Sequence, residues 1–181
     1  GKTRVLTHRV ALLIGARGVD PARILAITFT NKAAEEMRSR IHHLVGSRAR
    51  VIWISTFHAA CSRILRREAE RLGYRRNFVI YDDEDQLRMI ARIIRAMDLD
   101  TKRFPPRMVR SIIEGAKNEM VDADSFRDRV KDRFTETVAD IYKAYQAQLL
   151  RNNAMDFDDL LLNTIAVFEL FPPVLEHYQE L

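Results

Sequence analysis

Residues 24–41 read ILAITFTNKAAEEMRSRI, and residues 51–67 read VIWISTFHAACSRILRR. Each stretch opens with a short apolar run, 24–29 in the first and 51–54 in the second, of the kind found in parallel strands that are buried on both faces. Each run is followed by apolar residues at helical spacing. The two stretches therefore predict two strand–helix units of an α/β fold with a parallel sheet.

The flanking sequence first extends this pattern and then departs from it. Residues 3–14 have helical spacing and Gly73 ends the second strand–helix unit, so we expect the order helix, strand, helix, strand, helix. After residues 78–81 (FVIY) no strand pattern recurs. The helices expected beyond this point are one capped by Asp82 and those at 106–116, 123–130, 136–150, 157–168 and 173–181. The sequence thus predicts an α/β part at 1–76, a mostly helical insertion at 77–152 and returning helices at 153–181.

The composition fits a protein with its own hydrophobic core. With 181 residues, 47% of them apolar, the chain can form one large domain or one domain with an insertion. Its single cysteine, Cys61, excludes an internal disulfide framework. No apolar run approaches the roughly 18 residues of a membrane span and no leader resembles a signal peptide, so we expect a cytoplasmic protein without membrane contact.

The net charge of +5 is unevenly distributed along the chain. Residues 1–75 contain 15 Lys and Arg against 5 Asp and Glu, whereas residues 76–181 contain 15 against 20. Positive charge of this kind binds nucleic-acid phosphates, because binding releases counterions. The first part is therefore a candidate nucleic-acid surface, and a solvated basic surface without a partner is the alternative.

Polar and aromatic side chains follow both predicted strands where each strand ends. They are Thr28, Phe29, Thr30, Asn31 and Lys32 after the first strand, and Thr56, Phe57 and His58 after the second. Ligands of open α/β sheets bind beyond the carboxyl ends of the strands, and free amides at helix starts attract phosphate. The hydroxyls, with Lys32 or His58, can hold phosphates there, while Phe29 or Phe57 packs against a base or sugar. The alternative is two ordinary helix caps with both phenylalanines in the core.

The first three residues, Gly1-Lys2-Thr3, match the end of the phosphate-binding loop G-x-x-x-x-G-K-[ST]. In that loop backbone amides surround the phosphates, the lysine reaches the β- and γ-phosphates, and the hydroxyl holds Mg²⁺. The earlier positions of the pattern are not in this sequence. A chain terminus without a binding role is the alternative.

Five stretches in order carry a resemblance to a known family. They are GKTRVLTHRV (1–10), ILAITFTNKAAEEMRSRI (24–41), VIWISTFHAACSRILRR (51–67), NFVIYDDEDQ (77–86) and MDFDDLL (155–161). In this order and spacing they resemble the N-terminal part of the UvrD/PcrA/Rep family of superfamily-one DNA helicases, over essentially the whole chain. Of these stretches, TFTNKAA and STFHA are specific as a pair.

The resemblance implies a fold and a set of binding residues. Residues 1–76 would be part of an incomplete RecA-like P-loop motor domain, 77–152 a helical insertion near the duplex junction, and 153–181 the return to the motor. Gly1, Lys2, Thr3 and Arg4 would bind ATP, with Lys2 and Thr3 catalytic and Thr3 holding Mg²⁺ through the nucleotide. The single-stranded DNA track would consist of Thr28, Phe29, Thr30, Asn31, Lys32, Thr56, Phe57 and His58.

The function implied by the resemblance is that of an ATP-dependent 3′-to-5′ DNA helicase, of which the chain would be a fragment. Such a protein binds single-stranded DNA and the single-strand/duplex junction, uses ATP and Mg²⁺, and acts in DNA repair or replication, whose proteins are candidate partners. The bacterial cytoplasm or nucleoid is the implied location. Two alternatives stay open: the motor of a RecB- or AddA-type helicase–nuclease, and a non-enzymatic nucleic-acid-binding or protein-binding module.

Simpler roles are expected for three other charged groups. Asp82–Asp85 is typical of a helix cap and first turn rather than of a metal site. The same holds for Asp156, Asp158 and Asp159. Arg66 and Arg67 are expected to be solvated charges on a helix.

The family's Asp-Glu-x-Gln strand, whose carboxylates hold Mg²⁺ and activate water, lies outside this sequence. Phosphoryl transfer depends on several charged groups acting at once. We therefore predict no DNA-stimulated ATP hydrolysis by the purified chain, whereas Lys2→Ala abolishes hydrolysis in the full-length protein. Phosphate release measured with and without single-stranded DNA tests this, and substantial turnover by the purified chain would contradict it.

Overall fold

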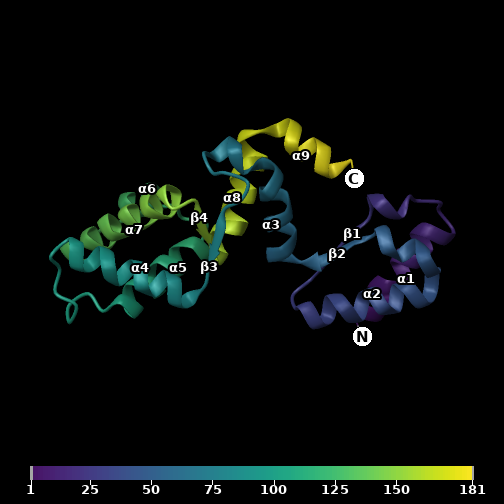
Figure 1. Cartoon of the computed structure of the whole chain (residues 1–181), viewed down its shortest axis with the longest axis horizontal. Coiled ribbons are helices and arrows are strands. Elements are labelled where there is room, and N and C mark those ends of the chain that lie inside the picture. The colour runs from purple at the N-terminus through teal and green to yellow at the C-terminus, as the bar shows by residue number, and fades with distance from the viewer. Residues whose placement is uncertain (1, 181) are drawn as a thin grey trace. The chain divides into compact units, whose positions relative to one another are not determined.

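The computed structural model describes residues 2–180 (Figure 1). Most of these residues are helical, and the described strands form two separate two-stranded parallel sheets. The chain divides into two compact units, Gly1–Arg63 with Phe168–Leu181 (unit 1) and Ile64–Val167 (unit 2). Within residues 2–180 no single helix is both long and apolar enough to cross a membrane. Only α8 (Phe157–Leu170) and α9 (Pro172–Gln179), taken together as a bent pair, meet that test.

Unit 1 contains a two-stranded sheet and its connecting helices. Its elements are α1 (Lys2–Gly15), the 3₁₀ turn η1 (Pro21–Arg23), β1 (Leu25–Thr28), α2 (Asn31–Val45), η2 (Gly46–Val51), β2 (Trp53–Thr56), the start of α3 (Phe57–Glu68) and α9 (Pro172–Gln179). The predicted order helix, strand, helix, strand, helix is confirmed. β1 and β2 pair in parallel, with Leu25 opposite Trp53 and Thr28 opposite Thr56.

The core of unit 1 is formed by α1, α2 and the sheet. Its buried apolar residues are Val10, Ile14, Ile24, Ala34, Met37, Ile41, Val45, Ala49, Ile52 and Ile54. In α2 they recur every three or four residues, as expected for one face of a helix. The prediction that both strands are buried on both faces is wrong for β1, because Leu25 is 45% exposed. A sheet of two described strands leaves part of each strand without a covering layer.

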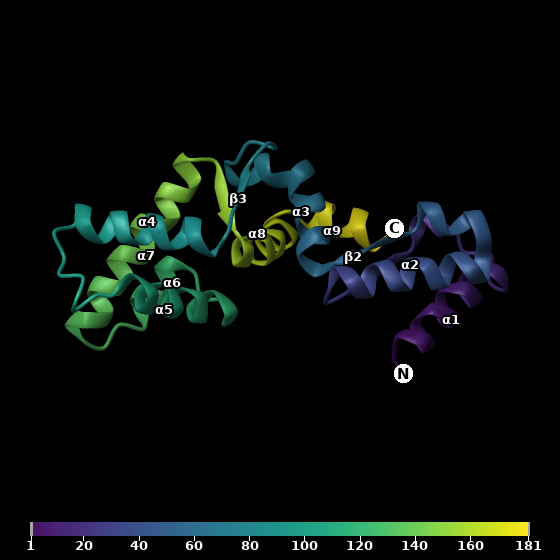
Figure 2. The same ribbon diagram turned by 60° about the horizontal axis from the view of Figure 1, so that its bottom comes forward.

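Unit 2 is mostly helical and also contains the second two-stranded sheet. Its elements are the end of α3, η3 (Ala69–Leu72), β3 (Val79–Tyr81), α4 (Asp83–Ala96), α5 (Pro106–Asn118), α6 (Ala123–Asp128), α7 (Arg133–Arg151), β4 (Ala154–Asp156) and most of α8 (Phe157–Leu170). Figure 2 shows α4 to α7 gathered together, and the contacts of α4 with α5 and α7, and of α6 with α7, agree with it. These helices enclose a second apolar core.

The strand β4 corrects the sequence analysis, which predicts no strand after residue 81. Ala154, Met155 and Asp156 pair in parallel with β3. Three residues are too few to show a strand pattern, so this strand depends on its distant partner rather than on local preference. The predicted helices are present within a few residues of their expected bounds. The domain limits at 76 and 152 differ from those of the compact units and stay a prediction.

Asn153 joins the two ends of the helical segment. Its Oδ1 accepts a hydrogen bond from the Arg75 amide at 2.8 Å, and its carbonyl accepts one from the Val79 amide at 2.9 Å. Its Nδ2 donates to Asn77 Oδ1 at 3.3 Å. Asn153 has a φ of 50°, a left-handed conformation that asparagine tolerates better than most residues. The chain therefore enters and leaves the helical segment at neighbouring positions.

The core of unit 2 yields a prediction about stability. Ile90 on α4 is fully buried, so Ile90→Ala removes packed methylene groups and leaves a cavity. We expect it to lower the free energy of unfolding by about 2–5 kcal/mol. Leu170→Ala, whose side chain is 65% exposed, is the control and should stay within about 0.5 kcal/mol of wild type. Urea unfolding followed by circular dichroism measures both, and equal effects would contradict the assigned packing of α4.

Candidate nucleic-acid interface

The parallel pairing of β1 and β2 brings the two predicted site segments together. Thr28 and Thr56 lie opposite each other at the last positions of the strands. Phe29 follows β1 directly, before α2 begins at Asn31, and Phe57 is the first residue of α3. Both segments therefore lie at one edge of the sheet, as the sequence predicts.

Phe29 and Phe57 form an aromatic pair at this edge. Their ring centroids are 5.6 Å apart and their planes are inclined by 48°. Phe29 is 90% exposed and Phe57 is 44% exposed, so the alternative that places both phenylalanines in the core is wrong. Exposed aromatic faces are the usual platforms on which proteins stack the bases of single strands. The pair has the chemistry of a base-stacking site.

The three threonines of the site already make hydrogen bonds within the chain. Thr30 caps α2, accepting from the Ala33 amide at 3.1 Å, and Thr56 accepts from the Ala59 amide at 3.3 Å. Thr28 is 8% exposed and donates to the Thr30 carbonyl at 3.1 Å. The hydroxyls therefore shape the two turns. Their predicted contact with phosphate stays a prediction.

The first turns of helices α1, α2 and α3 in unit 1 contain no acidic side chain that would neutralise the positive end of the helix dipole, in contrast to most of those in unit 2. The side chains of Asn31, Lys32 and His58 are exposed in the first turns of α2 and α3. The first turns of α1, α2 and α3 carry no Asp or Glu, whereas those of α4, α6, α7 and α8 do. Free amides and the helix dipole attract anions. Those of α2 and α3, beside the aromatic pair, can attract phosphates from outside the chain.

Arg38 links α2 to the strand that carries the second segment. Its Nη2 donates to the carbonyl of Ile54 on β2 at 2.9 Å, and its Nη1 forms an ion pair with Glu35. Because this contact ties α2 to β2, the two site segments are held by the scaffold rather than by flexible loops.

Of the predicted ATP-binding residues, Thr3 and Arg4 are described in full and lie in the first turn of α1. Gly1 and the side chain of Lys2 lie outside the described part of the structure, but α1 begins at Lys2, as expected for a helix that opens on GKT. Thr3 is half-buried and Arg4 is exposed. A hydroxyl beside free helix amides fits a nucleotide phosphate and its Mg²⁺. No group of three His, Cys, Asp or Glu side chains within residues 2–180 is arranged to hold a metal ion.

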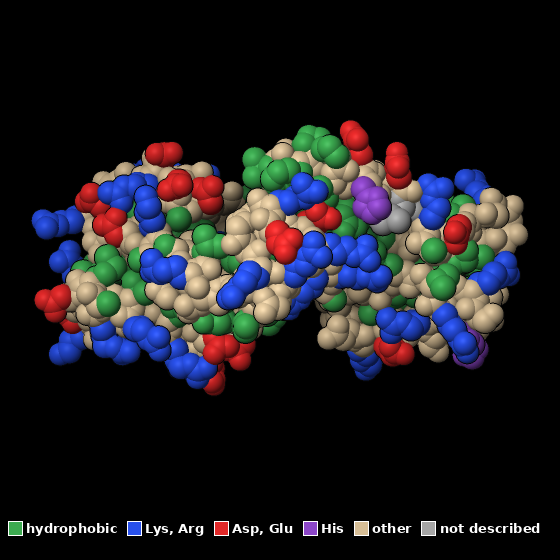
Figure 3. All heavy atoms as spheres, turned by 45° about the horizontal axis from the view of Figure 1, so that its top comes forward, with side chains coloured by type: hydrophobic (Ala, Val, Ile, Leu, Met, Phe, Trp, Pro, Cys, Tyr) green, Lys and Arg blue, Asp and Glu red, His purple; other side chains and the backbone are tan. Residues whose placement is uncertain are grey.

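A basic groove of about 390 Å³ lies between α1 and α2. It is lined by Arg4, Thr7, His8, Arg40, His43 and Leu44. Part of the positive charge of residues 1–75 is therefore gathered between these two helices. Figure 3 shows further Lys and Arg side chains (blue), interspersed with Asp and Glu (red), on the face that it draws. This distribution suits contact with a polyanion.

Comparison with known proteins assigns the chain to a family. The sequence model of the UvrD/REP helicase N-terminal domain matches residues 1–181. The chain belongs to this family. Over 179 residues it is 52% identical to an ATP-dependent DNA helicase PcrA of Staphylococcus epidermidis and 50% identical to one of Staphylococcus aureus. The alignments cover 99% of this chain but 25% and 24% of those relatives, so the chain spans about a quarter of their length.

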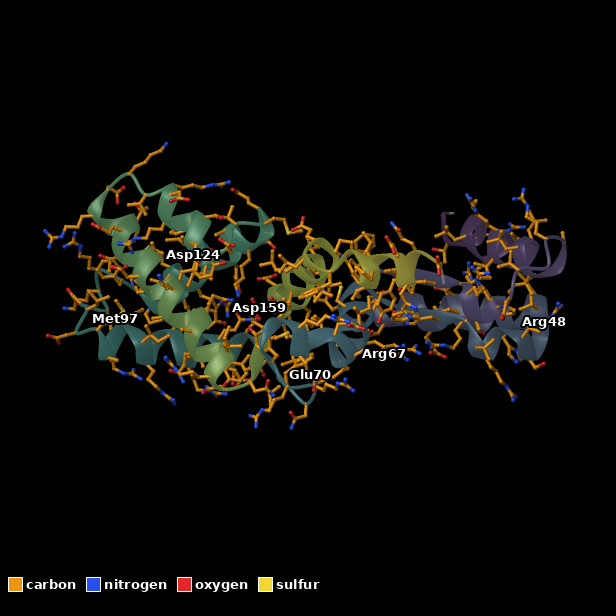
Figure 4. The ribbon with its side chains drawn as sticks, turned by 90° about the horizontal axis from the view of Figure 1, so that it is seen from above. Arg48, Arg67, Glu70, Met97, Asp124 and Asp159 are labelled. Carbon is orange, nitrogen blue, oxygen red and sulfur yellow. The ribbon has the colours of Figure 1, made fainter. Side chains whose placement is uncertain are left out.

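This UvrD/REP-family chain also contains a buried charge cluster that the sequence analysis missed. Lys117 Nζ lies 2.6 Å from Asp156 Oδ2 and 2.8 Å from Asp159 Oδ1, and the three side chains are at most 2% exposed. Figure 4 labels Asp159 at the start of α8, beside the helices of unit 2. Asp156 and Asp159 also accept hydrogen bonds from each other's backbone amides at the start of α8, which confirms the predictions of Asp156 as a cap and of Asp159 as a first-turn acid.

A sequence signal for Lys117 exists in α5. Val109, Ile113 and Lys117 are spaced four residues apart, and all three are buried. Residues with this spacing share one face of a helix. A lysine that continues an apolar stripe therefore predicts a buried cation with an acidic partner.

The carboxylates keep Lys117 charged. Burial alone would lower the pKa of Lys117, but the adjacent Asp159 and Asp156 outweigh it and raise the pKa above its usual value. Burial raises the pKa of Asp159, and Lys117 offsets only part of that shift. We assign a protonated lysine to the cluster at neutral pH, since both carboxylates contact it directly.

Arg66 corrects another expectation, because it is not a solvated charge. Its Nη1 donates to the Arg76 carbonyl at 2.8 Å, and its guanidinium lies 3.8 Å from the centroid of the Phe78 ring. This cation–π contact fixes the segment before β3. Arg67, in contrast, is exposed as predicted.

The exposure of Phe29 leads to a prediction about thermal stability. Because its ring is 90% exposed, Phe29→Ala should change the melting temperature of the chain by no more than about 2 °C. Ile54→Ala, on β2 and 4% exposed, should lower it by at least about 4 °C. Differential scanning fluorimetry compares the two, and a large loss in Phe29→Ala would place that ring in the core.

Proposed function

We propose that the full-length protein is an ATP-dependent DNA helicase that moves 3′ to 5′ along single-stranded DNA and unwinds duplex DNA. In this proposal the chain supplies part of the first motor domain and of the DNA track. The observation that carries the proposal is the exposed pair of Phe29 and Phe57 at the joined ends of β1 and β2. The relatives named ATP-dependent DNA helicase PcrA support the same activity.

The proposed DNA contact is independent of base sequence. A base stacks on Phe29, which any base can do because every base has an aromatic face. The free amides at the starts of α2 and α3, together with Lys32 and His58, hold the neighbouring phosphates. Asn31, Thr28, Thr30 and Thr56 shape or complete this surface. The hydrogen bond from Arg38 to the Ile54 carbonyl holds α2 against β2.

The remaining predicted parts complete the proposed motor. Residues 1–76 and 153–181 belong to a RecA-like domain, and residues 77–152 engage the single-strand/duplex junction. Gly1, Lys2, Thr3 and Arg4 hold the ATP phosphates, and Thr3 helps to hold Mg²⁺. When bound, MgATP supplies the free energy of movement through hydrolysis. DNA repair or replication is the setting that we propose, with proteins of those processes as partners.

Phe29→Ala in the full-length protein tests the proposed DNA track. A stacked base is worth about 1–3 kcal/mol, so the affinity for single-stranded DNA should fall about five-fold or more. DNA-stimulated ATP hydrolysis at limiting DNA should fall in parallel. Fluorescence anisotropy with a labelled oligothymidylate at several salt concentrations measures the affinity. Because stacking releases no counterions, the affinity of the variant should be lower than that of wild type by the same factor at every salt concentration.

The matched control for this experiment is Arg92→Ala, an exposed change on α4 in unit 2. It should leave single-strand affinity and ATP hydrolysis nearly unchanged. A folded Phe29→Ala variant with wild-type affinity would refute the assignment of Phe29 to the DNA track.

A further inference from the structure

The buried cluster of Lys117, Asp156 and Asp159 connects four elements of unit 2, namely α5, α7, β4 and α8. Lys117 lies in the last turn of α5, and both aspartates lie at the junction of β4 and α8. From α7, the Tyr145 hydroxyl donates to Asp156 Oδ2 at 2.9 Å, and Gln146 Nε2 donates to Asp159 Oδ1 at 3.1 Å. The cluster therefore ties α5 and α7 to the start of α8.

Stability alone does not account for this cluster. Removing three charged groups from water is costly, and replacing buried ion pairs by well-packed apolar residues is often neutral or stabilising. The surrounding core is apolar and already extensive. A buried cluster in which each charge is paired does, however, fix one arrangement of the groups that it joins, because any other arrangement leaves a charge without a partner.

The arrangement that is fixed here is the start of α8. The Asp156 amide donates to Asp159 Oδ2 at 3.1 Å, and the Asp159 amide donates to Asp156 Oδ1 at 2.8 Å. Lys117 bonds to the remaining oxygen of each carboxylate. One lysine thus holds both halves of the cap on which the first turn of α8 depends.

The helix α8 is also a covalent connection between the units. It begins at Phe157 in unit 2, and its residues from Phe168 onward belong to unit 1. A helix resists bending because each turn is hydrogen-bonded to the next. The first turn of α8, which contains Asp159, therefore belongs to the same hydrogen-bonded helix as Phe168 to Leu170.

We propose that Lys117 is a positioning residue for duplex unwinding. Through Asp156 and Asp159 it sets the start of α8, so that force on the helical segment is passed along α8 to the ATP-hydrolysing part of the protein. This role rests on the proposed helicase function. Lys117 contacts neither DNA nor ATP in this role, and it does not set the rate of hydrolysis on single strands.

The test uses the full-length protein and two variants of the cluster. Lys117→Met alone leaves two buried carboxylates without their cation. The triple variant Lys117→Met, Asp156→Asn, Asp159→Asn keeps the side-chain sizes and the capping groups but removes all three charges. Lys143→Met, a lysine on α7 whose side chain is 68% exposed, is the control.

Three quantities are measured for each variant: the melting temperature, ATP hydrolysis on saturating single-stranded DNA, and base pairs unwound per ATP on a duplex with a 3′ single-stranded tail. Lys117→Met should lower the melting temperature, and the triple variant should recover most of the loss. Both should keep ATP hydrolysis nearly unchanged and unwind at least about five-fold fewer base pairs per ATP, the lower end of typical coupling between sites. Lys143→Met should resemble wild type in all three.

The outcomes separate the role of Lys117 from the proposed function. A stable triple variant with wild-type unwinding per ATP overturns the positioning role and leaves the cluster a purely structural feature. If neither cluster variant folds, Tyr145→Phe decides, because it removes one hydrogen bond to Asp156 without leaving a charge unpaired. It should lower unwinding per ATP at unchanged hydrolysis, and an unchanged ratio overturns the proposal. A wild-type protein without DNA-stimulated hydrolysis refutes the helicase function itself.

Discussion

Parallel pairing between strands is the constraint on which both units depend. Two parallel strands cannot be joined by a tight turn, so a longer connection must run between them. In unit 1 the connection from β1 to β2 includes α2, and the pairing of Thr28 with Thr56 brings the two strand ends to one edge. In unit 2 the pairing of β3 with β4 brings together the two ends of a segment that contains the four helices α4 to α7. The first pairing brings the two segments of the proposed DNA track together, and the second places Asp156, the last residue of β4, at the start of α8.

The strands of the first pairing and their parallel direction could be predicted from the sequence, although their register and the exposure of Leu25 could not, and β4 of the second pairing was not predicted at all. The runs at 24–29 and 51–54 are apolar enough to indicate strands, and their helical flanks indicate a parallel sheet. β4 has only three residues and no pattern of its own, and its partner lies 75 positions earlier in the chain. Its formation depends on the packing of the intervening helices and on the bonds of Asn153, which no local window of sequence contains.

The candidate site shows the same division between local and tertiary causes. The local sequence pattern predicts that Phe29 and Phe57 lie at strand ends. It does not predict their exposure, because an aromatic side chain that follows a buried strand can lie in the core as readily as on the surface. The threonines were open to two interpretations, and the structure shows that their hydroxyls serve the turns. Lys117 follows an apolar stripe at the correct spacing, yet its acidic partners lie about 40 residues further along the chain.

Phe29 and Lys117 both depart from the usual distribution of side chains between the surface and the interior of a protein. A large apolar ring is left in water at the first, and a charged side chain is removed from water at the second. Neither departure improves folding, since exposed rings gain no burial and buried charges must recover their lost hydration. The rest of the chain is locally consistent, with apolar helix faces inward and capped helix starts. In such a chain, departures of this kind are expected where a binding or mechanical role outweighs stability. The strand end that carries Phe29 and the helix start held by Lys117 are therefore the positions to which we assign the proposed DNA contact and the proposed positioning role.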